Sequence, residues 1–255
     1  MNIVDCNMWI GSGGAWGYVD APANPAGATT RQVKIEPGQV IEECKRAGID
    51  RACVIPLRHA EYEAANRYVA DVCAKHPEHF IGVAVHSPQR EQNRLRKLLT
   101  EEIKSMGMKA VRSDGPPTRE LLDVARELDI PVIYYPEARG ISQSYHMIAQ
   151  AYPDISFILP HLGGYGGSWN VHMDALDVAR RYSNVFIDTS AISVPPYLEM
   201  AVKELPSERI LFASCGPHLD ARVAVELIRL LDLPEKSREN VMGKNILRLL
   251  KLTAF

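Results

Sequence analysis

Eight short apolar segments, each followed by a longer segment with a helical pattern, set the strongest limit on how this chain can fold. The expected strands are Asn2–Trp9, Arg51–Pro56, Phe80–His86, Met108–Ser113, Pro131–Pro136, Ile155–His161, Asn184–Thr189 and Arg209–Ser214. Most are continuous apolar runs, which is typical of parallel strands covered on both faces. An open doubly wound sheet alternates in the same way but usually has fewer strands, so the pattern predicts a closed (β/α)8 barrel, the TIM-barrel fold.

The segments between these strands have helical periodicity. The expected helices are Gln39–Ala47, Ala60–His76, Gln89–Met106, Thr118–Leu128, Ser142–Tyr152, Val171–Tyr182, Pro195–Leu205 and Leu219–Leu231, with a last helix at Ser237–Leu250. No linker, tandem repeat or low-complexity tract interrupts the alternation. Single α/β barrels have about 250 residues, so the 255 residues predict one domain over residues 1–255.

The composition argues against several classes of function. A formal net charge of −2 gives no basic surface for nucleic acid or a membrane, and no apolar run approaches the ~20 residues of a membrane span. The first residues already form an expected strand, which leaves no room for a signal peptide. The five cysteines are scattered, odd in number and without a CxxC pair, so they predict no disulfide framework and a reducing, cytoplasmic compartment.

The longest segment without a regular pattern is Gly11–Gln32, which is rich in Gly, Ala and Pro. Its glycines do not fit a dinucleotide-binding fingerprint, because Trp16 stands where the third glycine belongs. A loop of this length after the first strand has two interpretations: an active-site lid, or a long surface loop without a role in function.

Polar side chains gather where the expected strands end. In a parallel barrel these ends face a common mouth, which is where the active sites of such enzymes lie. The candidates are Asn7, Trp9, Pro56, Arg58, His86, Arg112, Asp114, Tyr135, Glu137, His161, Asp188, Ser190, Cys215 and His218. Of these, Arg58 with the adjacent His59 is expected to belong to a solvated loop. We expect this mixed-charge set to surround a site for a small molecule.

Two of these residues are candidates for acid–base or nucleophilic chemistry. His161 directly follows a strand and precedes two glycines that let the backbone turn tightly; it is either an acid or base, or a structural histidine. Cys215 follows the last strand and is either a nucleophile activated by a nearby histidine or a buried, inert thiol. We predict that the side chains of His161 and Cys215 lie close together, since only one strand lies between the two strands that they follow.

The other candidates have binding or positioning roles. An inward-facing Arg112 suits a substrate carboxylate or phosphate, and an internal pair with Asp114 is the alternative. Tyr135 either donates a hydrogen bond or covers the barrel core. Asp188 and Ser190 either orient a histidine or cap a turn. The remaining expected substrate contacts are Asn7, Trp9, His86, Glu137 and His218.

A series of short motifs runs along nearly the whole chain. They are Ile3-Val4-Asp5, Ala47-Gly48-Ile49-Asp50-Arg51-Ala52, His76-Pro77-Glu78-His79-Phe80-Ile81-Gly82, Tyr152-Pro153-Asp154, His161-Leu162-Gly163-Gly164, Asn184-Val185-Phe186-Ile187-Asp188-Thr189-Ser190, Arg209-Ile210-Leu211-Phe212 and Gly243-Lys244-Asn245-Ile246-Leu247-Arg248-Leu249. In this order and spacing the chain resembles amidohydrolase-related proteins (amidohydrolase 2) of the aminocarboxymuconate-semialdehyde decarboxylase type. The resemblance implies a metal-dependent-hydrolase-like barrel, hydrolysis or decarboxylation of a small carbonyl or carboxylate compound, and a homodimer.

The resemblance also implies a divalent metal such as zinc. Such enzymes hold it with an HxH pair on strand one, a histidine after strand five and an aspartate after strand eight. The corresponding residues here are Asn7, Trp9, Tyr135 and Cys215, and only His161, catalytic or an auxiliary ligand in such enzymes, is kept. Asparagine is a poor zinc ligand and tryptophan cannot serve as one. The sequence therefore predicts that the family metal site is lost and that no cofactor is required.

These replacements leave three hypotheses for the function. The first is a metal-independent hydrolase or decarboxylase in which His161 acts as acid or base, and Tyr135 and Asn7 stabilise an oxyanion. The second is a catalytically inactive relative that binds a metabolite or a partner protein. The third is a metal enzyme with a rebuilt site made of His161, Cys215 and His218.

Overall fold

A computed structural model describes residues 2–15, 31–59, 61–136, 140–165, 169–192 and 194–253 of the chain. Within these ranges nine strands form one sheet, in the order β2-β1-β3-β4-β5-β6-β7-β8-β9. The strands are β1 Val4–Ala15, β2 Arg31–Ile35, β3 Arg51–Pro56, β4 Phe80–His86, β5 Ala110–Ser113, β6 Val132–Tyr134, β7 Phe157–Leu159, β8 Val185–Asp188 and β9 Ile210–Leu211. Apart from β2, neighbouring strands run parallel.

Backbone hydrogen bonds between the first and last parallel strands close the sheet into a barrel. The Cys6 N–H donates to the Phe212 carbonyl at 3.0 Å, and the Cys215 N–H donates to the Asn7 carbonyl at 3.0 Å. The strands are almost wholly buried, as β4 illustrates along its full length, because side chains fill the interior and helices cover the outside. The predicted TIM barrel is therefore confirmed.

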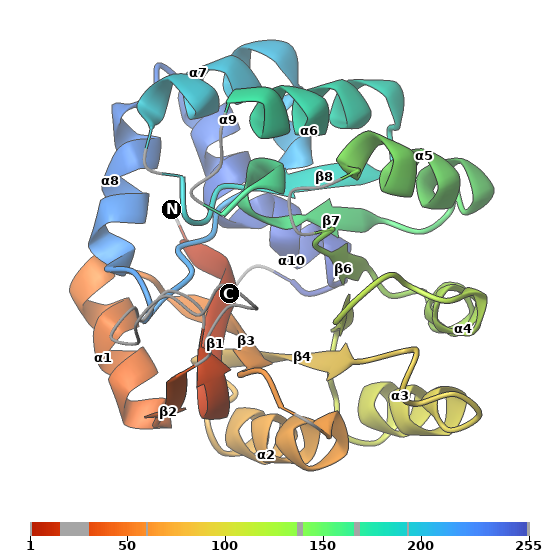
Figure 1. Cartoon of the computed structure of the whole chain (residues 1–255). Coiled ribbons are helices and arrows are strands. Elements are labelled where there is room, and N and C mark those ends of the chain that lie inside the picture. Colours follow the sequence, from red (N-terminus) through yellow and green to blue (C-terminus); the bar gives the residue numbers. More distant parts are fainter. Residues whose placement is uncertain are drawn as a thin grey trace.

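Helices surround the strands, as Figure 1 shows. They are α1 Pro37–Ala47, α2 Tyr62–Lys75, α3 Leu95–Lys104, α4 Arg119–Leu128, α5 Ile141–Ala151, α6 Trp169–Arg181, α7 Pro195–Glu204, α8 Ala221–Leu230, α9 Glu235–Glu239 and α10 Asn245–Leu249. Their ends follow local sequence: the Thr118 hydroxyl accepts the Leu121 N–H at the start of α4, and Asp129 ends that helix in the left-handed region. None of the helices in the described ranges is long and apolar enough to cross a membrane.

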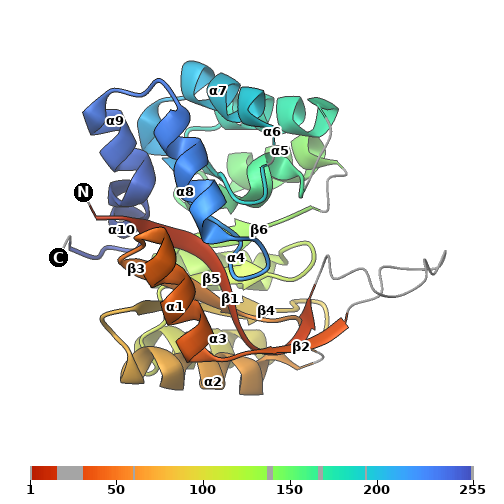
Figure 2. The ribbon, with the colours of Figure 1, turned by 90° about the vertical axis from the view of Figure 1, so that its left-hand side faces the viewer.

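The loop predicted over Gly11–Gln32, after the first predicted strand, is partly a pair of strands. β1 continues to residue 15, and its last five residues pair antiparallel with β2. Gly13 permits this course, since a Cβ there would collide with the carbonyl oxygen of Arg58. In Figure 2 the paired ends of β1 and β2 project from the carboxyl-end side of the barrel. Residues 16–30, where a lid was expected, lie outside the described residues.

The last predicted helix, Ser237–Leu250, is interrupted. A π-helical turn over residues 240–244 separates α9 from α10. The carbonyl of Val241 accepts the N–H of Phe212 at 2.9 Å, just beyond β9. Gly243 lies so close to the N-terminal segment that a Cβ would be 2.6 Å from the carbonyl oxygen of Asn2. Contact with the barrel base therefore interrupts a helix that periodicity alone predicts as continuous.

Candidate active site

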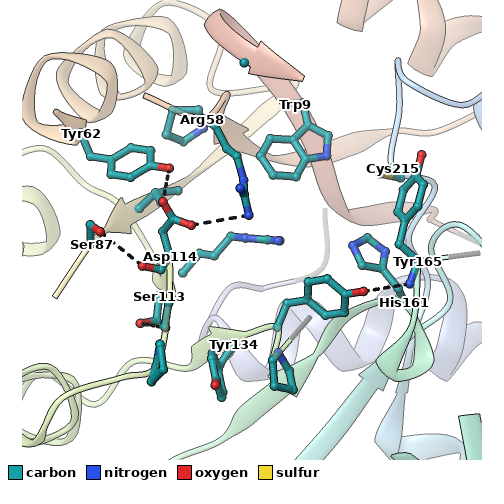
Figure 3. Close-up of a pocket in the computed structure, with 18 of the residues that line it drawn as sticks. Trp9, Arg58, Tyr62, Ser87, Ser113, Asp114, Tyr134, His161, Tyr165 and Cys215 are labelled. Atoms are coloured by element: carbon teal, nitrogen blue, oxygen red, sulfur yellow. Dashed lines mark hydrogen bonds and ion pairs between the residues drawn. The ribbon is translucent and has the colours of Figure 1, made fainter. Parts of the chain in front are cut away.

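A pocket of about 870 Å³ lies at the carboxyl ends of the parallel strands. It is lined by Trp9, Gly14, Pro56, Arg58, Tyr62, Val85, Ser87, Arg90, Arg112, Ser113, Asp114, Gly115, Pro116, Tyr134, Tyr135, Pro136, His161, Tyr165, Cys215 and His218. In Figure 3, Arg58, Tyr62 and Asp114 occupy one side, and His161, Tyr165 and Cys215 the other. Of the nine residues that the sequence predicts for catalysis or substrate binding, six line this pocket, namely Trp9, Arg112, Tyr135, His161, Cys215 and His218.

His161 sits in a strained turn directly after β7. Its φ of 60° lies in the left-handed region, which is uncommon for a residue other than glycine. The Asp188 carboxylate holds this conformation by accepting the His161 N–H at 2.8 Å. The ring Nδ1 lies 2.7 Å from the Ser190 hydroxyl oxygen. Asp188, at the end of the neighbouring strand, therefore fixes the backbone of His161, and Ser190 fixes its ring.

The hydrogen bonds around Ser190 determine which nitrogen of His161 carries the proton. The Ser190 hydroxyl oxygen is 2.5 Å from Asp188 Oδ1, so the hydroxyl donates to the carboxylate. The same oxygen must then accept from its other neighbours, the Asn7 amide at 3.3 Å and His161 Nδ1. His161 is thus assigned the Nδ1–H tautomer, with the lone pair on Nε2. No hydrogen bond within the described residues engages Nε2.

Burial makes His161 a neutral base. Desolvation lowers its pKa to about 4; the Asp188 charge acts in the opposite direction, and the Arg112 charge adds to the lowering. The rings of Tyr135 and Tyr165 both meet the imidazole edge-on, with centroids 5.3 Å away. The Tyr135 hydroxyl oxygen accepts the Tyr165 N–H at 3.2 Å, which leaves its own proton available to a ligand.

Arg112 is the most poorly satisfied polar side chain of the pocket. Its guanidinium carbon lies 5.0 Å from the centroid of the Trp9 ring. In the described residues, Nη1 of Arg112 is buried and has no hydrogen-bond partner. Trp9 Nε1 is also buried and has no oxygen or nitrogen acceptor there. Burial lowers the pKa of Arg112, while the charge of Asp188 raises it. The expected internal pair with Asp114 does not form.

Asp114 instead pairs with other residues of the rim. Its carboxylate accepts the Tyr62 hydroxyl at 2.8 Å and lies 3.7 Å from the Arg58 guanidinium. Arg58 is one of the strand-end residues of the sequence, where a solvated loop was expected, and it lines the pocket instead. Tyr62 and Tyr165 were not among the candidates, and nothing in the local sequence marks these two tyrosines.

Cys215 and His161 line the same pocket, but no hydrogen bond joins their side chains. His161 Nδ1 instead contacts the Ser190 hydroxyl. Burial raises the pKa of the Cys215 thiol to about 12. A thiol with this pKa remains protonated at neutral pH and is a poor nucleophile. The alternative of an inert buried thiol therefore fits the structure better.

The remaining sequence candidates lie outside the pocket wall. His86 is buried between Glu91 and Glu102, 2.7 and 2.6 Å from its two ring nitrogens, so neither is open to a substrate. Asn7 is buried beside Asp188 and Ser190, and its Oδ1 has no hydrogen-bond partner. His86 is therefore a correction to the expected substrate contacts, and Asn7 acts through the histidine network. Glu137 lies outside the described residues.

His218 completes the wall beside Trp9. The two ring centroids are 5.8 Å apart, and burial lowers the pKa of His218 to about 4. Beneath them, the Asp5 carboxylate accepts the N–H groups of Asn7 and Ser214 at 2.9 and 3.1 Å. Burial raises the pKa of Asp5 to about 7 in spite of these bonds. Asp5 is thus a buried carboxyl group that joins β1 to the segment after β9.

The residues that the sequence resemblance places at metal positions offer few metal donors. The Asn7 amide nitrogen donates to a carboxylate, and the Trp9 indole has no lone pair to offer a metal. In the part of the chain that the structure describes, no three His, Cys, Asp or Glu side chains are placed to hold a metal. The rebuilt site of His161, Cys215 and His218 is therefore not formed.

The closed parallel barrel with its pocket at the carboxyl ends of the strands has the arrangement typical of TIM-barrel proteins. The sequence matches the family described as Amidohydrolase over residues 26–252, so the chain belongs to this family. No curated protein matches the sequence significantly.

Several solved structures share the fold over nearly their whole length. A 5-carboxyvanillate decarboxylase from Sphingomonas paucimobilis is 16% identical with a TM-score of 0.73, covering 99% of each chain. A 2,6-dihydroxybenzoate decarboxylase from Rhizobium is 16% identical with a TM-score of 0.75, covering 98% of this chain and 99% of its own. A dihydroxybenzoic acid decarboxylase from Polaromonas, solved with manganese and 2-nitroresorcinol, is 16% identical with a TM-score of 0.72, covering 100% and 98%. At this identity the likeness shows the fold alone.

Proposed function

We propose that this protein is a metal-independent hydrolase that cleaves an ester, lactone or amide bond in a small carboxylate compound. The observation that carries the proposal is the set of hydrogen bonds around Ser190, which assigns the Nδ1–H tautomer to a buried His161 that lines the pocket and leaves Nε2 without a hydrogen bond in the described residues. A neutral imidazole with one free lone pair is suited to accept a proton, not to donate one. This favours activation of water over protonation of a carbon atom.

The proposed reaction uses His161 as a general base. Nε2 takes a proton from water while the water oxygen bonds to the substrate carbonyl carbon, and the carbonyl oxygen becomes an oxyanion. The Tyr135 hydroxyl, whose oxygen accepts the Tyr165 N–H, donates its proton in a hydrogen bond to that oxyanion. When the tetrahedral intermediate collapses, the bond to the leaving group breaks and the imidazolium returns its proton to the leaving oxygen or nitrogen. The free carboxylic acid and the alcohol or amine are the products.

Decarboxylation of a hydroxybenzoate is a second candidate. It is favoured by the shared fold with decarboxylases of 5-carboxyvanillate and 2,6-dihydroxybenzoate. It requires a proton donor to the ring carbon that loses carbon dioxide, and the assigned tautomer of His161 supplies none from Nε2. For that reason we rank it below hydrolysis.

The test is turnover of a substrate panel by protein treated with EDTA. The panel contains aromatic esters and lactones that carry a free carboxylate, for example monomethyl isophthalate, and hydroxybenzoates for the decarboxylase arm. We expect acid release on the ester or lactone arm, with a loss of about 10²–10⁴-fold in kcat for His161→Ala. The exposed His146→Ala is the matched control and keeps full activity.

Two outcomes would contradict the proposal. Carbon dioxide release from hydroxybenzoates without ester hydrolysis would support the decarboxylase instead. Activity that disappears with EDTA and returns with manganese or zinc would show a metal-dependent reaction.

A further inference from the structure

Arg112 carries a charge from β5 into the pocket and is partly buried there. In the described part of the chain its Nη1 is buried and has no hydrogen-bond partner. Removing a charged group from water without pairing it is costly. Its one close contact is the face of the Trp9 ring, 5.0 Å from the guanidinium carbon, and a cation–π contact offsets only part of that cost.

The charge of Arg112 acts on other side chains of the pocket. Trp9 lies against the guanidinium, and the Arg112 charge acts to lower the pKa values of His161 and Cys215, which line the same pocket. The chain itself therefore supplies a cation to the pocket from β5.

The donors around this point lack a strong acceptor, and the surrounding wall is aromatic. Arg112 Nη1 is a buried N–H donor without an acceptor in the described residues, and Trp9 Nε1 has only the weak sulfur acceptor of Cys215. The pocket wall also contains Tyr62, Tyr134, Tyr135 and Tyr165. A planar anion presents two oxygens to a guanidinium and a flat apolar body to aromatic rings.

We propose that Arg112, rather than a metal ion, binds the carboxylate of a planar aromatic or conjugated acid, together with the indole N–H of Trp9. The proposal deepens the proposed function, since it names the group by which the substrate is held, and it rests on that function only for the reaction that follows binding. Arg112 anchors the carboxylate, and the rest of the planar molecule extends between Trp9 and the tyrosines toward His161.

Binding of benzoate to EDTA-treated protein, measured by isothermal titration calorimetry, tests the proposal. Benzamide, which has the same shape without the charge, is the matched ligand control. We expect benzoate to bind about ten- to a hundred-fold more tightly than benzamide, the range for a charged hydrogen-bonded contact. Arg112→Met should remove this advantage and leave benzamide binding in place. Trp9→Phe, which keeps the ring and removes the N–H, should reduce benzoate affinity several-fold.

Two further variants keep the test decisive. Arg112→Lys retains a cation without the planar fork, and we expect it to fold and to recover part of the benzoate preference. Arg229→Met, at an exposed arginine on α8, should bind benzoate as the wild type does. The proposal fails if benzoate and benzamide bind equally, if Arg112→Met keeps the preference, if inorganic phosphate competes as well as benzoate, or if added manganese strengthens benzoate binding ten-fold.

This measurement is independent of turnover because benzoate has no bond to hydrolyse. Benzoate binding that persists in His161→Ala, without turnover of any panel compound by the wild type, would uphold the carboxylate site and overturn the hydrolase. Turnover without a charge preference would do the reverse.

Discussion

Two buried histidines at strand ends, His86 and His161, have pKa values shifted in opposite directions. For His86, burial alone would lower the pKa, but hydrogen bonds to Glu102 and Glu91 outweigh it and raise the pKa to about 9. For His161, burial prevails and lowers the pKa to about 4. The difference lies in the atoms that touch the ring, since carboxylates contact both nitrogens of His86 and a serine hydroxyl contacts one nitrogen of His161.

The carboxylate near His161 is kept one group away from the imidazole. Asp188 uses one oxygen to accept the N–H of His161, the N–H of Ser190 and the Ser190 hydroxyl. Asp188 therefore helps to orient the imidazole of His161 but does not form the direct ion pair that would keep the imidazole protonated. His86 is a cationic cross-link between β4 and α3, whereas His161 is a neutral base. The depth of burial alone does not decide which of the two a histidine becomes.

The largest expected effect in this comparison comes from breaking the His86 cluster. Glu102 accepts from both the His86 ring and the Asn66 amide at 2.6 and 2.8 Å, and all three side chains are buried. Glu102→Ala leaves a buried imidazolium and a buried amide without this acceptor, so we expect a loss of about 3–5 kcal/mol in the free energy of unfolding. Urea unfolding of the variant and wild type at pH 7 measures it.

A surface carboxylate provides the control for this substitution. Glu127 pairs with Arg96 on the exposed faces of α4 and α3, and Glu127→Ala should change stability little. Equal stability losses for the Glu102 and Glu127 variants would show that the buried cluster does not hold α3 against the barrel.

The next effect is the pH dependence of stability that His86 produces. Its pKa is about 9 in the folded protein against 6.5 ordinarily, so the folded state holds the proton more tightly. The stabilisation is complete below pH 6.5 and is lost as the pH rises through about 9, by about 3 kcal/mol in total. Unfolding free energies from pH 6 to 9.5 should fall with pH in the wild type and less steeply in His86→Gln. Parallel curves for the two proteins would contradict the raised pKa.

The sequence predicted the barrel and much of its mouth for physical reasons. Continuous apolar runs indicate buried parallel strands, and the strand-end rule then brings Trp9, Arg112, Tyr135 and His161 to one pocket. The rule does not give side-chain direction. His86 ends its strand as the others do, but Glu102, sixteen residues later in α3, draws its ring away from the mouth.

Other parts of the structure depend on contacts between distant segments. The pairing of β1 with β2 and the interruption between α9 and α10 both involve backbone from elsewhere in the chain. Periodicity within a segment carries no information about such contacts. The contact of His161 with Ser190, 29 residues away, is another contact of this kind.

The smallest expected effect, and the one that sharpens the comparison most, is the removal of the Ser190 hydroxyl. In Ser190→Ala the Nδ1–H of His161 loses its acceptor, so the imidazole is no longer confined to one tautomer. Nitrogen-15 spectra of histidine-labelled protein at pH 7, assigned with His161→Gln, should show a neutral Nδ1–H form for wild-type His161 and an imidazolium for His86. In Ser190→Ala we expect the His161 signals to move toward a mixture of tautomers while those of His86 stay unchanged. In the hydrolase assay kcat should fall about ten-fold with little change in KM, the size of one lost hydrogen bond, and Ser190→Thr, which keeps a hydroxyl, should recover most of it. A Ser190→Ala variant with an unchanged His161 tautomer would mean that Ser190 does not position the base.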